Sequence, residues 1–476
     1  AQSLDNLGIS AIREKLEHLL VKFLKDSTIS WCPVMEARPE VTIRRDSHTH
    51  LSFFEEKSVS IWGCGALGAH IAVYLCRAGV RKLTLRDHGL VTPGILVRQP
   101  YTYRDIGKQK VEALKEKLLS INPDLEISEY YSDIVYELGK PDFVWSDGAD
   151  VVIDATASQL VRMRLETVWN SANQPHIPVA SLMVDQTATH LMTGIAQGHF
   201  SGATWDLFRK AKLELLRDSM YLPFADSFFP NGDDIRKPFQ PEPGCSEPTF
   251  IGSSADSAGL AGIGLNLIAT AVSTDSPGGT VQFFSQNSNQ SRLPAPTIFT
   301  FKSDMIFYAT PYTVRISPDA LSELCAVINQ NRRIRGKNIE TGGLIWGEWD
   351  DGMQVVWISN VSGPPQDSFQ SENSFRCGRE GTSEEHRIRQ DWSRLSVGYL
   401  GMWHTHPNSQ PFPSPTDEHG MAEILSSGPL PPRKQALLIT GIISGETYLG
   451  CYLFERTSLK ICLIGKEIQP FPNVKL

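Results

Sequence analysis

The sequence predicts an α/β protein whose first domain is a doubly wound, mostly parallel sheet, followed by a second domain of strands and helices. A short apolar strand at 58–62, a glycine-rich turn, a helix at 69–78 and a strand at 82–85 form a βαβ unit, which implies parallel strands. The apolar run 151–154 is a later strand of the same kind. A polar segment at 273–296 then separates this pattern from a new one.

Length and composition indicate a multidomain soluble chain. Its 476 residues, 41% of them apolar, correspond to about three domains of ordinary size. A net charge of −8 argues against a general nucleic-acid or membrane-surface binder, whose surface would be basic. Eight cysteines without a C-x-x-C pair fit a reducing compartment, and no export signal opens the chain. We expect a cytoplasmic protein; because the chain begins at Ala1 without Met, upstream domains stay an open question.

The domains are expected in the following order. Residues 1–50 form a helical extension, because apolar residues recur at helical spacing from Ile12 to Leu24. The parallel-sheet domain covers 51–290, a linker covers 291–310, and the second domain covers 311–476. Within these ranges we expect an amphipathic helix at 204–217, a buried helix at 258–272 that is too short to span a bilayer, a strand at 312–316, a helix at 318–329 and a strand at 343–347.

A glycine-rich turn follows the first strand and opens a helix. Gly63, Gly65 and Gly68 let the backbone approach a phosphate, and the helix N-terminus favours its negative charge. Asp87 ends the next strand, about where an acid would hold ribose hydroxyls. These residues alone are as typical of a nicotinamide dehydrogenase as of any other nucleotide-binding protein.

Cations follow the acid that would hold the ribose. Arg98, Gln99 and Lys110 lie where a triphosphate would extend, whereas NAD needs no such cluster. Asp154 ends its strand at the carboxyl edge of the sheet, where ligands bind in doubly wound folds. The combination favours ATP with a metal ion. The alternative is that these charges only solvate the edge of the sheet.

With these motifs, residues 55–272 resemble the ThiF-type superfamily of ubiquitin-activating enzymes, which adenylate the C-terminal carboxylate of a ubiquitin-like protein. The resemblance implies a Rossmann-like adenylation domain that forms a homodimer. It also implies that Asp87 holds the ribose, Arg98 and Lys110 the phosphates, and Asp154 a magnesium ion.

One position departs from the pattern of this family. The family usually has Asn three residues before the arginine, and this chain has Ile95. The departure puts one hydrogen bond to the nucleotide in doubt, but not the fold.

Cys245 lies in a proline-rich loop at 228–250, just before a helix expected near Ala255. A thiol near a helix N-terminus can have a lowered pKa, and a long loop lets it reach an activated carbonyl. Cys245 resembles the thioester-forming cysteine of the family, which would pass the ubiquitin-like protein to a conjugating enzyme. The alternative is an inert loop cysteine. Cys64 and Cys76 are expected to be packing residues.

A histidine pair ends an apolar strand in the second domain. His404 and His406 are two residues apart, so their side chains project from one face of the strand. Ser414 and Asp417 complete the pattern H-x-H-x7-S-x-x-D, which supplies two nitrogens and one oxygen and leaves a tetrahedral zinc ion one position for water. Such a match arises by chance on the order of one time in a thousand in a chain of this length.

The pattern is similar to that of the JAMM metalloproteases (the JAB or MPN domain), over residues 312–454. The resemblance implies an α+β fold with a catalytic acid in an early strand, which Glu340 matches. Zinc lowers the pKa of its water to about 7, so Glu340 would take the proton and pass it to the leaving amine. Ser414 would donate a hydrogen bond to the tetrahedral oxyanion. The alternative is a buried histidine pair in an inactive domain.

Together the two resemblances predict a bifunctional enzyme, an ATP-dependent activating enzyme fused to a zinc isopeptidase. We expect it in a bacterial ubiquitin-like conjugation system, of the kind associated with phage defence, with a ubiquitin-like protein and a conjugating enzyme as partners. A rival is sulfur-carrier activation and tail trimming for cofactor or cysteine biosynthesis. Cys245 and the absence of paired C-x-x-C motifs weigh against that rival. A non-enzymatic protein that only docks a ubiquitin-like partner would leave both sets of site residues idle.

Overall fold

The computed structural model describes residues 2–28, 30–32, 46–169, 177–231, 250–274, 278–286, 296–427, 431–458 and 460–471. The chain divides into two units, residues 1–48 and 49–476. The first unit contains one long helix, α1 (Gln2–Asp26), where the sequence predicts a helical extension. The second unit contains two large sheets, and each is described below within that unit.

The first sheet is the doubly wound, mostly parallel sheet that the sequence predicts. Its eight strands have the order β3-β2-β1-β4-β5-β6-β7-β8, and the first five run parallel while the last three are antiparallel. The order reverses between β1 and β4, which creates the crevice where doubly wound folds bind ligands. The strands are β1 (Ser58–Trp62), β2 (Lys82–Arg86), β3 (Glu126–Tyr130), β4 (Val151–Asp154), β5 (Val179–Val184), β6 (His190–Ala196), β7 (Gly279–Ser285) and β8 (Thr297–Phe301).

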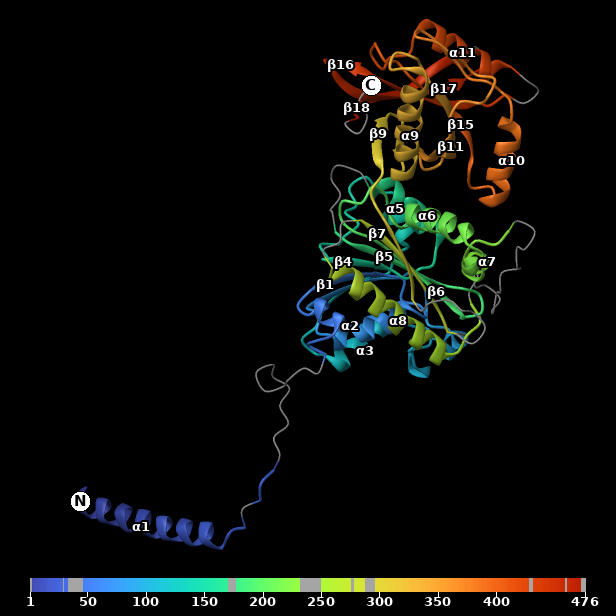
Figure 1. Ribbon diagram of the computed structural model, residues 1–476. Helices are drawn as coiled ribbons and strands as arrows, with labels where there is room; N and C mark the ends of the chain where they lie inside the picture. The colour runs from blue at the N-terminus through green and yellow to red at the C-terminus, as the bar shows by residue number, and fades with distance from the viewer. Residues whose placement is uncertain are drawn as a thin grey trace. The chain divides into compact units, whose positions relative to one another are not determined.

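Helices cover both faces of this sheet, which is why β1 and β4 are buried along their whole length. Alternate residues of a strand enter different cores: Ile61 packs on one face and Trp62 on the other. Figure 1 shows α2, α3 and α8 on one side of the sheet and α5 and α6 on the other. The helices are α2 (Gly68–Arg77), α3 (Lys110–Ile121), α4 (Ile134–Glu137), α5 (Gln159–Trp169), α6 (Thr204–Arg217), α7 (Leu222–Phe228) and α8 (Ser254–Val272).

Helix α8 begins at Ser254, close to the start expected near Ala255 and ahead of the apolar stretch 258–272, because Ser253 and Asp256 form a capping box. Within the described part of the chain, α8 is the helix long and apolar enough to cross a membrane by length and composition. Half of its apolar window is buried, and Leu260 and Leu265 lie in the core against the sheet. The apolar character of α8 is therefore explained by core packing.

The second sheet is mixed and has the order β18-β17-β16-β15-β11-β12-β10-β9. Its apolar core includes Val314, Ile345 and Trp403. The strands are β9 (Met305–Ala309), β10 (Tyr312–Ile316), β11 (Gly342–Asp350), β12 (Val355–Val361), β15 (Gly398–Thr405), β16 (Lys434–Ile443), β17 (Glu446–Arg456) and β18 (Ile461–Pro470). A small hairpin, β13 (Phe369–Gln370) with β14 (Phe375–Arg376), and the helices α9 (Pro318–Arg335), α10 (Thr382–Trp392) and α11 (Pro415–Ser426) complete the domain.

The structure differs from the predicted linker at 291–310. In its described part, β8 pairs with β7 in the first sheet and β9 pairs with β10 in the second, so only 302–304 lies between the two sheets. Phe299 and Phe301 pack against the core of the first sheet, which explains why β8 is a strand. The polar composition that suggested a linker belongs to residues that precede β8.

Candidate active sites

His404, His406 and Asp417 bring three ligand atoms together. The Nε2 atoms of the two histidines lie 3.0 Å apart, and the Asp417 carboxylate oxygens lie 3.4 Å from His404 Nε2 and 3.6 Å from His406 Nε2. Ligand atoms around a tetrahedral zinc ion, at bond lengths near 2.0 Å, are about 3.3 Å from one another. The separations among these three side chains are therefore compatible with a zinc ion.

Neighbouring groups hold His406 and Asp417 in place. His406 Nδ1 lies 3.0 Å from the Gln410 carbonyl oxygen. Because a carbonyl only accepts, Nδ1 carries the proton and Nε2 keeps its lone pair for a metal. The backbone N–H and the hydroxyl of Ser414 each donate to Asp417 Oδ2 at 2.7 Å, and this capping box starts α11. The oxyanion role of Ser414 stays a prediction, since its hydroxyl here bonds Asp417.

Glu340 lies beside this centre because of strand register. Gly342 of β11 pairs with His404 of β15, and Thr405 N donates to Thr341 O at 2.8 Å, so the segment before β11 runs alongside the histidines. Burial raises the pKa of Glu340 to about 7; Asp417 adds to the rise, and His406 opposes it. A carboxyl group that titrates near neutral pH suits proton transfer.

The pKa of Asp417, the acid of the metal cluster, is shifted in the opposite direction to that of Glu340. Burial by itself would raise the pKa of Asp417, but hydrogen bonds with His404, His406 and Ser414 hold it well below its usual value. Asp417 is therefore suited to be an anionic ligand, while the Glu340 carboxyl is suited to exchange a proton. The different surroundings of the two acids shift their pKa values in opposite directions.

The three glycines of the turn after β1 have different structural roles. A Cβ at Gly63, whose φ is +87°, would lie 2.9 Å from Thr156 N, and one at Gly68 would lie 1.9 Å from Gly63 O. A Cβ at Gly65 would meet nothing within 4 Å. Gly63 and Gly68 are therefore needed to pack the turn, whereas Gly65 leaves open space where a phosphate could approach the backbone.

Asp87 and Lys110 converge at the same edge of the sheet. Asp87 accepts hydrogen bonds from Cys64 N at 2.7 Å and Gly89 N at 2.6 Å. A Cβ placed on Gly89 would lie 2.9 Å from Asp87 Oδ1 and 3.0 Å from Lys110 Nζ, so the carboxylate and the ammonium flank one point. Cys64 is fully buried, and burial raises the pKa of its thiol, as expected of a packing residue.

Arg98 and Gln99 are also buried, but Arg98 faces a different segment. Its Nη1 donates to the Phe250 carbonyl at 2.6 Å, and the guanidinium lies 5.1 Å from the centre of the Phe250 ring. Ile95, where the family has Asn, packs in the apolar core. Cys245 lies outside the described residues.

Asp154 is fully buried at the end of β4. Its Oδ1 accepts from Thr156 N at 3.0 Å and Thr156 Oγ1 at 2.6 Å, and its Oδ2 accepts from Ser181 Oγ at 3.0 Å. Arg162 of α5 is buried nearby, and its Nε and Nη1 have no hydrogen-bond partner among the described residues. Ser181 and Arg162 carry no motif, so the sequence did not indicate them.

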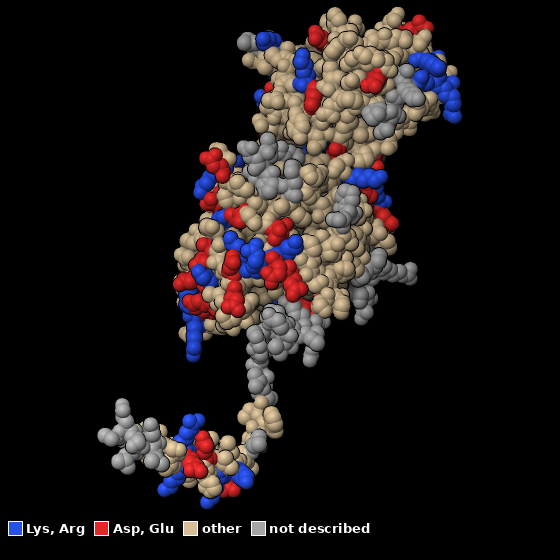
Figure 2. Space-filling view, turned by 90° about the vertical axis from the view of Figure 1, so that its left-hand side faces the viewer, with Lys and Arg blue, Asp and Glu red and all other residues tan. Residues whose placement is uncertain are grey.

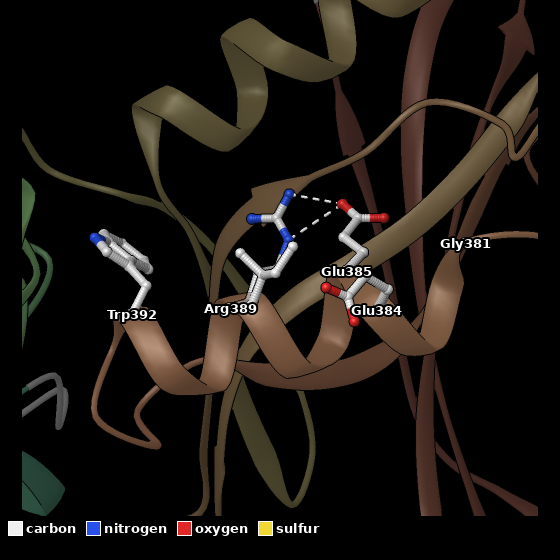
Figure 3. Close-up of a pocket in the computed structure, with 6 residues that line it drawn as sticks. Gly381, Glu384, Glu385, Arg389 and Trp392 are labelled. Atoms are coloured by element: carbon white, nitrogen blue, oxygen red, sulfur yellow. Dashed lines mark hydrogen bonds and ion pairs between the residues drawn. The ribbon is translucent and has the colours of Figure 1, made fainter.

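A pocket of about 480 Å³ lies along α10, away from the predicted site residues. Figure 3 shows that Arg389 points along the helix to Glu385, with Nη2 to Oε1 at 2.8 Å, while Trp392 lies further along the helix. The Arg389 guanidinium also lies 4.9 Å from the Trp346 ring. All of the residues that line this pocket lie on α10 or at its N-cap, and none of them is a predicted site residue.

Fold and geometry define a class of protein in which a doubly wound α/β domain is joined to a second domain with a His-His-Asp centre. Comparison with known families agrees: residues 43–229 match the ThiF family, and residues 328–450 match prokaryotic homologs of the JAB domain. The chain is a fusion of a ThiF family domain with a JAB domain.

Characterised relatives match parts of the chain. It is 30% identical over 128 residues to the sulfur carrier protein ThiS adenylyltransferase of Escherichia coli, covering 27% of this chain and 50% of that protein. It is 31% identical over 127 residues to ubiquitin-like modifier-activating enzyme 5 of Caenorhabditis elegans (25% and 30%). It is 26% identical over 154 residues to a CD-NTase/cGAS isopeptidase of Enterobacter hormaechei (32% and 78%). The chain thus covers half or less of the length of the first two relatives.

Proposed function

We propose that the ThiF domain adenylates the C-terminus of a ubiquitin-like protein and that the JAB domain hydrolyses the peptide or isopeptide bond after such a C-terminus. The observation that carries the proposal is the convergence of His404, His406 and Asp417 beside buried Glu340, in one chain with the glycine turn and Asp87. Relatives named as an activating enzyme and as an isopeptidase support the two halves.

In the JAB domain, a zinc ion on the two histidines and Asp417 would polarise a water molecule and lower its pKa to about 7. Glu340, which lies beside the three ligands and has a pKa of about 7 in the zinc-free chain, would accept the proton of that water. It would then return the proton to the departing amine, so that the carbonyl carbon gains a hydroxyl and the amine leaves neutral. Ser414 is proposed to donate a hydrogen bond to the oxyanion.

In the ThiF domain, the open backbone at Gly65 and the side chains of Lys110, Arg98 and Gln99 would hold the phosphates of ATP. Asp87 is proposed to hold the ribose and Asp154 a magnesium ion. The substrate carboxylate attacks the α-phosphate, an acyl adenylate forms and pyrophosphate leaves. Cys245 is proposed to attack the acyl adenylate next, forming a thioester and releasing AMP, for transfer to a conjugating enzyme.

A second function has one observation in its favour. The relative that adenylates a sulfur carrier is 30% identical to this chain, close to the identity of the ubiquitin-like activating enzyme. Activation of a sulfur carrier would use the same adenylation step but need no thioester with a conjugating enzyme. We favour conjugation because Cys245 is present and paired C-x-x-C motifs are absent, and we propose a bacterial, defence-associated pathway from the family resemblance.

The basic and acidic side chains on one face of the larger unit lie interspersed, as Figure 2 shows. This fits a protein of net charge −8 that acts on protein partners and not on nucleic acid.

The test of the proposed function is pyrophosphate exchange into ATP in the presence of a candidate ubiquitin-like protein, together with cleavage of a fusion after the C-terminus of the same protein. Exchange without cleavage, or cleavage without exchange, would refute one half.

A further inference from the structure

Tyr101 is a buried tyrosine in the segment that carries Arg98 and Gln99. It is 7% exposed, and its ring lies in the core that α2, α3 and α8 share with the first sheet. Its hydroxyl donates to Cys64 O at 2.8 Å and, sharing the same proton, to Lys110 O at 3.3 Å. Burial raises the pKa of Tyr101, so the hydroxyl keeps its proton and stays a donor. One side chain thus ties the glycine turn to the first residue of α3.

The loop after β2 holds the same two residues from the other side. Cys64 N donates to Asp87 Oδ2 at 2.7 Å, and Lys110 N donates to Gly89 O at 3.0 Å. Gly89 N donates in turn to Asp87 Oδ1 at 2.6 Å. These bonds form a closed hydrogen-bond network, whose members are Tyr101, Cys64, Asp87, Gly89 and Lys110.

This network holds together the groups that are proposed to bind the nucleotide. Asp87, the acid proposed for the ribose, is a member, and Gly65 directly follows Cys64 in the glycine turn. Lys110 joins through its backbone, so the network does not use its ammonium group. Within the network, the tyrosine hydroxyl is the direct link between the turn and α3, while the other path runs through the loop 87–89.

We propose that Tyr101 is a positioning residue for the nucleotide, which fixes the separation between the glycine turn and Lys110. The inference rests on the proposed binding of ATP by the ThiF domain. Without the hydroxyl, the buried Cys64 carbonyl loses its donor and the turn loses its direct link to α3. The phosphates of ATP then meet a turn and a cation that are no longer held at one separation, and part of the binding free energy is spent on ordering them.

The test compares ATP with adenosine on the full chain, by competition against a fluorescent ATP analogue with magnesium in the buffer. Tyr101→Phe keeps the ring that fills the core, so the variant should fold. It should weaken ATP binding by about tenfold, the scale of one lost buried hydrogen bond. Adenosine has no phosphates to reach Lys110, so its affinity should change by less than about twofold.

Tyr74→Phe is the matched control. Tyr74 OH donates to Ala258 O at 3.0 Å, so this variant also loses one hydroxyl-to-carbonyl hydrogen bond of the same domain, here between α2 and α8. Thermal unfolding should show a lower Tm for both variants, because each loses a hydrogen bond. ATP affinity should fall in Tyr101→Phe and stay unchanged in Tyr74→Phe, a difference that a purely structural role of Tyr101 would not produce.

A double-variant cycle tests the path of the effect. Lys110→Met removes the cation proposed for the phosphates and should itself weaken ATP binding. In that background Tyr101→Phe should cause a smaller further loss than it causes alone, because the position of an absent ammonium group no longer matters.

Three outcomes overturn the inference while the proposed function stands. The first is an unchanged affinity of Tyr101→Phe for ATP. The second is a loss that appears equally for adenosine or equally in Tyr74→Phe, as general loosening of the domain would give. The third is full additivity of Tyr101→Phe and Lys110→Met. Failure of the wild-type chain to bind ATP would instead refute the proposed function of the ThiF domain, and the inference with it.

Discussion

His404 Nε2 and His406 Nε2 lie 3.0 Å apart, with both rings buried. Two protonated imidazoles cannot lie this close together, because their charges would repel each other in a poorly solvated site. Hydrogen bonds with Asp417 and Gln410 nonetheless raise the pKa of His406 against the effect of burial. The arrangement is stable when one cation, a proton or a metal ion, lies among the three side chains.

We therefore predict one zinc ion per chain. Elemental analysis of freshly purified protein should find it, and Asp417→Ala should lose it. Zinc at about 100 times its Kd should stabilise the fold by about 2.7 kcal/mol, and removal by a chelator should lower the Tm accordingly. Glu340→Ala is the matched control, since it should keep the metal and abolish cleavage. A chain that cannot take up zinc contradicts the assignment.

The pKa of Glu340 gives a prediction about pH. In the zinc-free protein its carboxyl should titrate near pH 7, so that the proton-accepting carboxylate is present above that pH and lost below it. Bound zinc, a positive charge, should lower this pKa. Carboxyl NMR with labelled glutamate, with Glu340→Gln to assign the signal, measures both values. A zinc-free pKa in the ordinary range for glutamate would show that burial does not tune this acid.

Two alanine substitutions in the glycine turn should differ in their effects on stability and on ATP binding. Gly68→Ala places a methyl group 1.9 Å from Gly63 O and should destabilise the fold by about 1–3 kcal/mol or more. Gly65→Ala meets no atom and should leave the Tm nearly unchanged while weakening ATP binding. Thermal unfolding and calorimetry separate the two effects. Equal loss of stability in both variants would argue that Gly65 has a structural role only.

Cys245 should become covalently loaded. After incubation with ATP and the ubiquitin-like partner, we expect an adduct that reducing agent removes and that is absent in Cys245→Ala, although pyrophosphate exchange persists. The experiment needs Glu340→Ala in the background, because an active peptidase would erase products. An adduct that forms equally on Cys245→Ala shows that another thiol is the acceptor.

The parallel sheet is confirmed, and His404, His406 and Asp417 do lie together, because both features depend on local patterns; the metal itself stays a prediction. A βαβ unit, an H-x-H pair on one strand and a capping box at Ser414 all involve residues close along the chain. The contacts between Arg315 and Glu166, and between Ser181 and Thr204, join residues far apart, and no local pattern marks them. Strand β8 was missed for a related reason, since its pairing with β7 outweighs the polar composition before it.

We propose that one chain carries two active sites for the same ubiquitin-like protein. Pyrophosphate exchange and cleavage of a C-terminal fusion should be measured side by side on the wild type, Asp154→Ala and Glu340→Ala. Asp154→Ala should lose exchange and keep cleavage, and Glu340→Ala should lose cleavage and keep exchange. Binding of NAD without ATP turnover, or loss of both activities from either single substitution, would contradict it.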